Sequence, residues 1–126
     1  RRRRIPSLSC TWARAQRQPD SRIQGIRHIW KMGERLLGGL NDAIRDSGVS
    51  AKAVSEPYPP MPIVRFTDED GRIRSAHEML WFRQAIGRGI LVCGHVWFIS
   101  LSHGEQEIDR TIEVLGESFK AVKGMI

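Results

Sequence analysis

The strongest constraint on this chain's fold is a run of apolar residues with helical spacing in its first half. Between Ile23 and Ile44 the apolar and small residues recur every three or four positions, at Ile23, Ile26, Ile29, Trp30, Gly33, Leu36, Leu37, Leu40, Ala43 and Ile44. A period of about 3.6 sustained over this length predicts one long amphipathic helix. Pro19, Asp20 and Ser21 supply its start signal, and Gly48 suits the left-handed position after its end.

The next part of the chain has strand and turn signals. Weak alternation from Val49 to Glu56 and a β-rich run from Ile63 to Thr67 predict two strands. Four prolines between residues 57 and 62 exclude helix and central strand there, because proline has no N–H to donate. Asp70 and Gly71 form a tight-turn pair.

The last part of the chain predicts a helix, two strands and a final helix. We expect Ser75 to cap the first of these helices, with an apolar face made of Met79, Leu80, Trp81 or Phe82, and Ile86. Strands are predicted at Ile90–Cys93 and Val96–Leu101. A final helix opening at Gly104 and Glu105 has an apolar face of Ile108, Ile112, Leu115, Phe119 and Val122.

This order of elements predicts the α+β class. We expect a two-layer sandwich in which a small antiparallel sheet carries three helices on one face. The expected core residues are Leu36, Leu40, Ile63, Phe98, Ile108 and Ile112.

The net charge of +6 comes from the first residues alone. Residues 1–22 hold seven arginines against Asp20, whereas residues 23–126 balance 13 basic against 13 acidic side chains. We therefore divide the chain into a basic, disordered leader over residues 1–21 and a neutral domain over residues 22–126. The leader could bind nucleic acid through Arg1–Arg4 or act as a transit peptide, but it lacks interleaved aromatic residues.

The chain lacks the sequence motifs of several classes of protein. Cys10 and Cys93 have no disulfide or zinc spacing, so a reducing, cytoplasmic setting is the expectation. His28 and His77 have no partner at metal-ligand spacing, and Ser100 and Ser102 lack the elbow of a hydrolase. No run of apolar residues approaches the length that a membrane-spanning helix needs.

One continuous stretch, Gly89–Glu113, has a more specific pattern. It reads as a glycine-led strand, a Trp97-Phe98-Ile99-Ser100 strand closing on His103, and a helix opening with Glu105, Ile108 and Asp109. This stretch resembles the closing segment of class III aminotransferases, which depend on pyridoxal phosphate (PLP), and most closely the glutamate-1-semialdehyde aminomutase-like branch. The likeness extends more generically over residues 22–123.

The resemblance implies that this chain is the C-terminal small domain of such a protein. In the family the small domain faces the substrate entrance, so His95 and Trp97 are candidates for its lining; alternatively His95 is a turn residue and Trp97 packs on a helix. A histidine before the last helix is also usual, which gives His103 a structural role in the turn. Gly104 replaces the family's usual Thr or Ser at the helix cap.

The sequence assigns no catalytic, cofactor-binding or metal-binding residue to this chain. PLP chemistry needs a lysine in a pocket, an acid against the ring nitrogen and donors for the phosphate. The family's lysine, acid and phosphate loop belong to its large domain, so we expect no PLP to bind this chain alone and no activity from it. The expected partner is that large domain or a second copy of the chain. The alternative is a stand-alone α+β binding or oligomerisation module.

Overall fold

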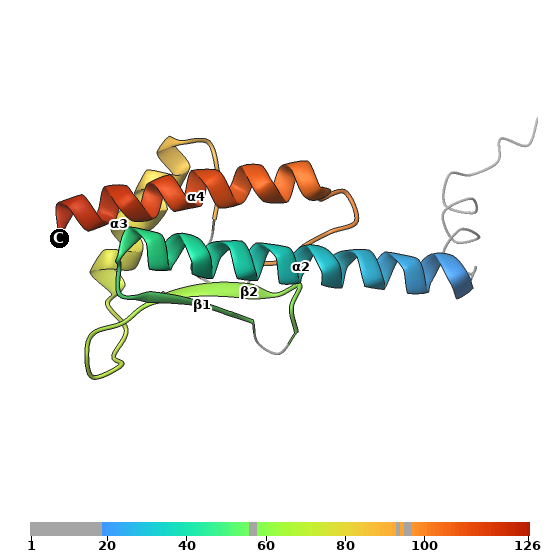
Figure 1. Ribbon diagram of the computed structural model, residues 1–126, viewed down its shortest axis with the longest axis horizontal. Coiled ribbons are helices and arrows are strands. Elements are labelled where there is room, and N and C mark those ends of the chain that lie inside the picture. The colour runs from blue at the N-terminus through green and yellow to red at the C-terminus, as the bar shows by residue number, and fades with distance from the viewer. Residues whose placement is uncertain (1–18, 56–57, 93, 95–96) are drawn as a thin grey trace, which may run out of the picture.

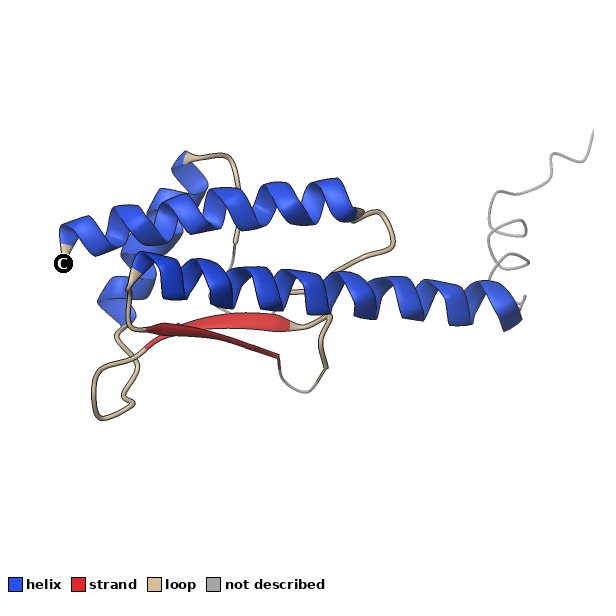
Figure 2. Cartoon of the chain, viewed as in Figure 1, coloured by secondary structure: helices blue, strands red, loops and turns tan. Residues whose placement is uncertain are grey.

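The computed structural model describes residues 19–55, 58–92, 94 and 97–126. Along the chain, helix α2 (Pro19–Ser47) is followed by strands β1 (Ala51–Ser55) and β2 (Pro62–Phe66), then by helices α3 (Ser75–Gly87) and α4 (Glu105–Met125). Helices and an antiparallel pair of strands occupy separate regions (Figures 1 and 2), which confirms the α+β class. The predicted disorder of residues 1–21 lies almost entirely outside the described residues.

Helices α2 and α4 form the long axis of the molecule and run in the same direction (Figure 1). Near their beginnings His28 contacts His103, and farther along Arg35 bonds to Asp109. Near their ends a Cβ atom on Gly116 would lie 3.3 Å from that of Ala43. The long helix is thus confirmed, and Gly48 ends it with the positive φ of 73° that its position requires.

The sheet consists of β1 and β2, paired antiparallel with Ala53 opposite Val64. At Ala53 the outer edge of β1 is bonded to one side chain from α2. Asn41 Nδ2 donates to the Ala53 carbonyl at 2.9 Å, and its Oδ1 accepts from the Ala53 N–H at 3.0 Å. One amide group therefore satisfies both backbone groups that Ala53 turns away from β2.

The two further strands expected at residues 90–93 and 96–101 are not formed by the described residues in those ranges. Trp97 N–H donates to the Pro62 carbonyl at 2.9 Å and Ile99 N–H to the Pro60 carbonyl at 3.1 Å, in antiparallel order. Because prolines have no N–H, Pro60 and Pro62 cannot donate in return, and the reciprocal ladder of a strand cannot form.

The first expected strand fails for a different reason. Gly89 has a φ of 90° and turns the chain at the end of α3. The Ile90 N–H then bonds back to the Ala85 carbonyl at 3.0 Å, as in a Schellman helix ending. The donor that would begin the strand is therefore used by the helix.

Helix α3 was predicted in the right place but with the wrong face. Trp81 and Ala85 are buried, whereas Met79 and Ile86 are 58% and 52% exposed. The helix has apolar residues on both sides, so their spacing does not distinguish the inner side from the outer. The predicted cap is also wrong: Ser75 lies inside the helix, and Arg74 occupies the cap position without a side-chain cap bond.

The core lies where α2, α3 and α4 meet the inner face of the sheet. Leu36, Leu40, Ile63 and Ile108 are buried as predicted, and Ile112 packs against them. Phe98 is wrong as a core residue, because it is 73% exposed. The centre is aromatic instead: the Trp81 ring stacks on Phe119 at 5.0 Å and on Trp97 at 5.9 Å.

Candidate functional site

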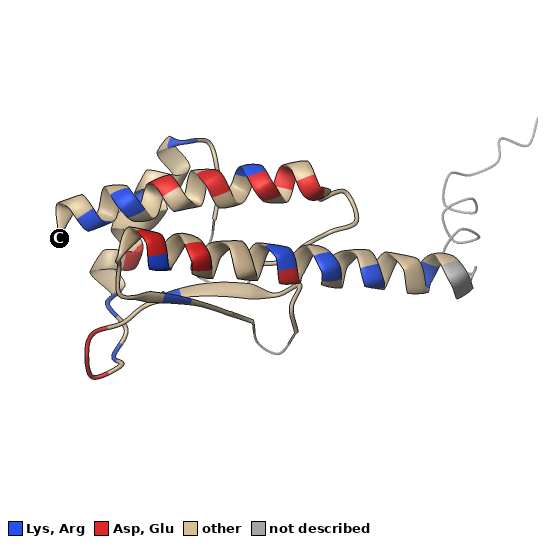
Figure 3. Ribbon diagram, viewed as in Figure 1, with Lys and Arg blue, Asp and Glu red and all other residues tan. Residues whose placement is uncertain are grey.

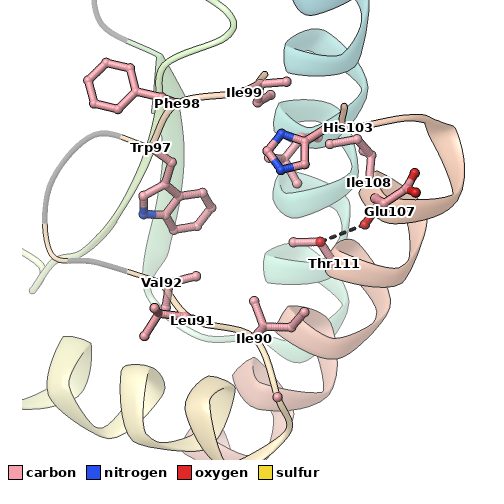
Figure 4. Close-up of a pocket in the computed structure, with 12 residues that line it drawn as sticks. Ile90, Leu91, Val92, Trp97, Phe98, Ile99, His103, Glu107, Ile108 and Thr111 are labelled. Carbon is pink, nitrogen blue, oxygen red and sulfur yellow. Dashed lines mark hydrogen bonds between the residues drawn. The ribbon is translucent and has the colours of Figure 1, made fainter. Parts of the chain in front are cut away.

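A cavity of about 760 Å³ opens between the start of α4 and the segment that joins α3 to α4. Ile90, Leu91 and Val92 lie on one side of it, and Trp97, Phe98 and Ile99 on another (Figure 4). Leu36 of α2 and Ile108 of α4 add to the lining. A cavity of this size with mainly apolar walls has the ordinary properties of a ligand or docking site.

The polar groups of the cavity lie together on the α4 side. His103, Glu107 and Thr111 are neighbours there (Figure 4). Thr111 Oγ1 donates to the Glu107 carbonyl at 2.7 Å, and Glu107 Oε2 accepts from the Gly104 N–H at 3.0 Å. The Glu107 side chain thereby supplies the helix cap that glycine itself lacks.

His103 bonds within the turn that precedes α4. Its Nδ1 accepts from the Ser100 N–H at 2.9 Å and lies 3.4 Å from Ser100 Oγ. Its own backbone carbonyl lies 2.8 Å from Nε2 of His28, which comes from α2. The structure therefore joins two histidines that lie 75 positions apart, and the sequence pattern had given His28 no role.

Charged side chains join the same ends of α2 and α4. Arg35 holds Asp109 with two bonds, Nε to Oδ1 at 2.7 Å and Nη2 to Oδ2 at 2.9 Å. One turn earlier, Lys31 Nζ lies 3.6 Å from Glu105 Oε1. The hydrogen bonds from Arg35 hold the pKa of Asp109 below its ordinary value, and the same bonds raise the pKa of Arg35.

Several large apolar side chains are exposed around the cavity and on the first half of α2. Leu91 is 87% exposed, and Phe98 and Leu101 are also exposed. The first turns of α2 extend past the other elements (Figure 1), and they expose Ile23, Ile26 and Trp30. Basic residues on this half of α2 flank those side chains, whereas acidic residues predominate along the start of α4 (Figure 3). Exposed apolar side chains grouped in this way are typical of interaction surfaces.

The chain's lysines do not fit the requirements of PLP. All four lysines, Lys31, Lys52, Lys120 and Lys123, are exposed, and Lys31 is paired with Glu105. A Schiff-base lysine must lie in a pocket where its charged form is disfavoured. No chemical step through the cofactor can therefore be assigned to this chain's residues.

The other residues singled out in the sequence are placed as follows. His95 lies outside the described residues. Trp97 lines the cavity and also stacks on Trp81 of α3, so it combines the two roles considered for it. His77 lies edge-on to Phe66, at 6.5 Å between ring centres. Among the described residues, no three His, Cys, Asp or Glu side chains are grouped as metal ligands, and none of their helices is long and apolar enough to cross a membrane.

Comparison with known proteins shows that the chain shares its fold with part of two solved structures. No family model matches the chain, and no curated protein does. Among solved structures, the FumI protein of Sphingopyxis sp. MTA144, in its PLP internal aldimine form, matches 86% of the chain with a TM-score of 0.71 at 22% identity. An omega-transaminase from Sphaerobacter thermophilus matches 78% of it with a TM-score of 0.68 at 15% identity. The chain covers 24% of the length of each of these proteins, whose fold it shares over that portion.

Proposed function

We propose that this chain is the C-terminal small domain of a class III, PLP-dependent aminotransferase or aminomutase, similar to glutamate-1-semialdehyde aminomutase. The observation that carries the proposal is the fold: 86% of the chain matches 24% of a PLP protein. The pattern of residues 89–113 supports the more specific branch. The chain is non-catalytic alone, because its own lysines are all exposed.

In this proposal the cavity end of the domain lies against the large domain that carries the cofactor. The exposed Leu91, Phe98 and Leu101 would be covered there, which would exclude water from the space between the domains. His95 and Trp97 line the substrate entrance, and His103 fixes the turn beside it. The two-layer arrangement is part of the same proposal: β1 and β2 form the small antiparallel sheet, the three helices lie on one face of it, and residues 97–101 run beside β2 without completing its ladder.

The proposal is tested most directly by the DNA upstream of the codon for Arg1, read in all frames. We expect it to encode a PLP domain with a lysine following a strand. An upstream region without such a domain, in the gene or beside it, would contradict the proposal.

A chemical test addresses the claim that this chain does not hold the cofactor. The purified chain is treated with PLP and borohydride, and the labelled lysines are identified by mass spectrometry. We expect weak labelling spread over the four lysines, with the same pattern in urea. One lysine labelled stoichiometrically in the folded chain alone would show a cofactor site and overturn the claim.

The alternative function is a stand-alone module that associates with itself through the same apolar surface. The exposure of Leu91 and Phe98 is the observation in its favour. Sedimentation of the chain and of a Leu91→Ser, Phe98→Ser variant distinguishes the two functions. A stable dimer of one stoichiometry that the variant abolishes favours the module, whereas weak, non-stoichiometric association favours a domain that lacks its partner.

A further inference from the structure

The wall segment, residues 97–103, needs more anchors than a strand would. Within the described part of the chain, two backbone bonds from this segment to the sheet side run one way, from Trp97 to Pro62 and from Ile99 to Pro60. The prolines can return none, so half of the usual ladder is missing. Contacts from outside the sheet must therefore contribute to holding this segment in place.

The second anchor is internal to the segment. His103 N–H donates to the Ser100 carbonyl at 3.1 Å, and Ser100 N–H donates to His103 Nδ1 at 2.9 Å. Because Nδ1 accepts a bond, the neutral ring carries its proton on Nε2. These bonds close the turn, but they do not attach it to the rest of the domain.

The third anchor attaches the turn to the long helix. The ring of His28 is half-buried, and its Nε2 lies 2.8 Å from the His103 carbonyl. A carbonyl oxygen only accepts, so this nitrogen must carry a proton and donate it. The contact lies beside Gly25, where an added Cβ would touch Leu101 at 3.2 Å, so α2 and the turn are closely packed here.

We propose that His28 is a positioning residue: by bonding the His103 carbonyl it fixes the wall segment on α2 and holds Trp97 in its place at the cavity. The local effect stands on the geometry alone. Its functional meaning rests on the proposed function, in which the cavity wall lines the substrate entrance.

The test compares His28→Leu with His28→Gln in the full chain. The Gln side-chain amide can donate from about the position of Nε2, whereas Leu fills the space without donating. Amide hydrogen exchange of Trp97, Ile99 and Ser100 is the readout, because all three N–H groups have acceptors in the structure. We expect about five-fold faster exchange in the Leu variant, as for loss of one ordinary hydrogen bond, and near-normal exchange in the Gln variant.

A merely structural role would give another pattern. If the Leu variant exchanges faster at α4 amides such as that of Leu115 to the same extent, His28 stabilises the whole fold and the proposal is wrong. Equal behaviour of the Leu and Gln variants would also overturn it. If the Leu variant does not fold, nitrogen NMR of the wild-type His28 ring decides: a proton on Nε2 supports the proposal, and a neutral ring with its proton on Nδ1 contradicts it.

These results are independent of the test of the proposed function. Local exchange changes without an upstream PLP domain would leave His28 as a positioning residue in a protein of another function. An upstream PLP domain without the local exchange changes would support the proposed function and show that His28 is not a positioning residue. If the local exchange changes are found together with an upstream PLP domain, the Leu variant of the complete enzyme should alter KM more than kcat, and the Gln variant should restore KM.

Discussion

The two ends of the α2–α4 pair are held together in different ways. At the closed end, residues 39–47 of α2 meet residues 112–123 of α4, and small residues allow a close approach: Gly39 contacts Ile112, and Ala43 lies against Gly116. At the open end, residues 23–35 meet residues 103–109 through His28, Lys31 and Arg35. Close packing of small residues thus joins the helices at one end, whereas polar bonds are added to the packing at the other.

This difference indicates where the domain's own stability lies and where a partner can bind. The closed end buries Leu40, Leu115 and Val122 completely, so these core side chains need no partner to cover them. The open end holds the cavity and most of the exposed apolar side chains, and its exposed ion pairs contribute little to stability. The domain is thus stable at one end and available for contact at the other.

The largest expected effect comes from truncating one α2 side chain at each end. Leu40→Ala should cost about 2–5 kcal/mol of unfolding free energy, because it leaves a cavity in the core. Ile26→Ala, on the projecting turns where the side chain is 57% exposed, should change it by less than about 0.5 kcal/mol. Urea unfolding of both variants measures the difference. Equal losses would mean that the projecting turns are buried by the domain itself.

A second pair of variants tests how closely the proline turn approaches α2. A Cβ atom at Gly33 would lie 2.5 Å from the Pro59 carbonyl carbon and 2.6 Å from the Pro60 nitrogen. Because those are backbone atoms, Gly33→Ala should cost about 1–3 kcal/mol. Gly38→Ala meets no atom within 4 Å and should stabilise the helix by up to about 1 kcal/mol. Thermal unfolding should therefore shift in opposite directions, and a shift in the same direction would contradict the packing described.

The smallest expected effect is the pH dependence of the Arg35–Asp109 pair. The pKa of Asp109 is lower in the folded state than in the unfolded state. The stabilisation by Asp109 is therefore present above its unfolded pKa and is lost as pH falls through its folded pKa. Asp109→Asn should thus destabilise the chain at neutral pH and reduce the loss of stability in acid. High salt should weaken the wild-type effect. Urea titrations at several pH values measure the unfolding free energy of both proteins. If the variant loses as much stability in acid as the wild type, the pair does not contribute to the pH dependence.

Local sequence patterns were sufficient to predict the helices that have a single apolar face. Helices α2 and α4 have apolar residues on one side only, so their spacing indicated both their extent and the burial of Leu40 and Phe119. Helix α3 has apolar residues on both sides, so its spacing predicts that Met79 and Ile86 are buried, although both are exposed. Periodicity predicts a helix reliably, but it predicts the buried side only when the other side is polar.

The cavity wall depended on contacts that no local pattern contains. Trp97–Ile99 have the composition of a strand, but their neighbours are two prolines that lie more than thirty positions earlier in the chain. The sequence contains the run of prolines, but it does not predict that their carbonyl groups face this segment. His28 was likewise unpredictable, because its acceptor is a backbone carbonyl 75 positions away and carbonyls have no sequence signature.

The Asn41 side chain has a consequence for how other chains can attach to the sheet. An exposed edge strand usually invites strand addition, because its free N–H and C=O groups bond to any extended segment. At Ala53 both groups are already bonded to Asn41, so an incoming strand would first have to displace an amide from the protein's own longest helix. Association through that edge is thereby disfavoured without a charge or a bulge, and contacts between chains are directed to side chains elsewhere on the surface.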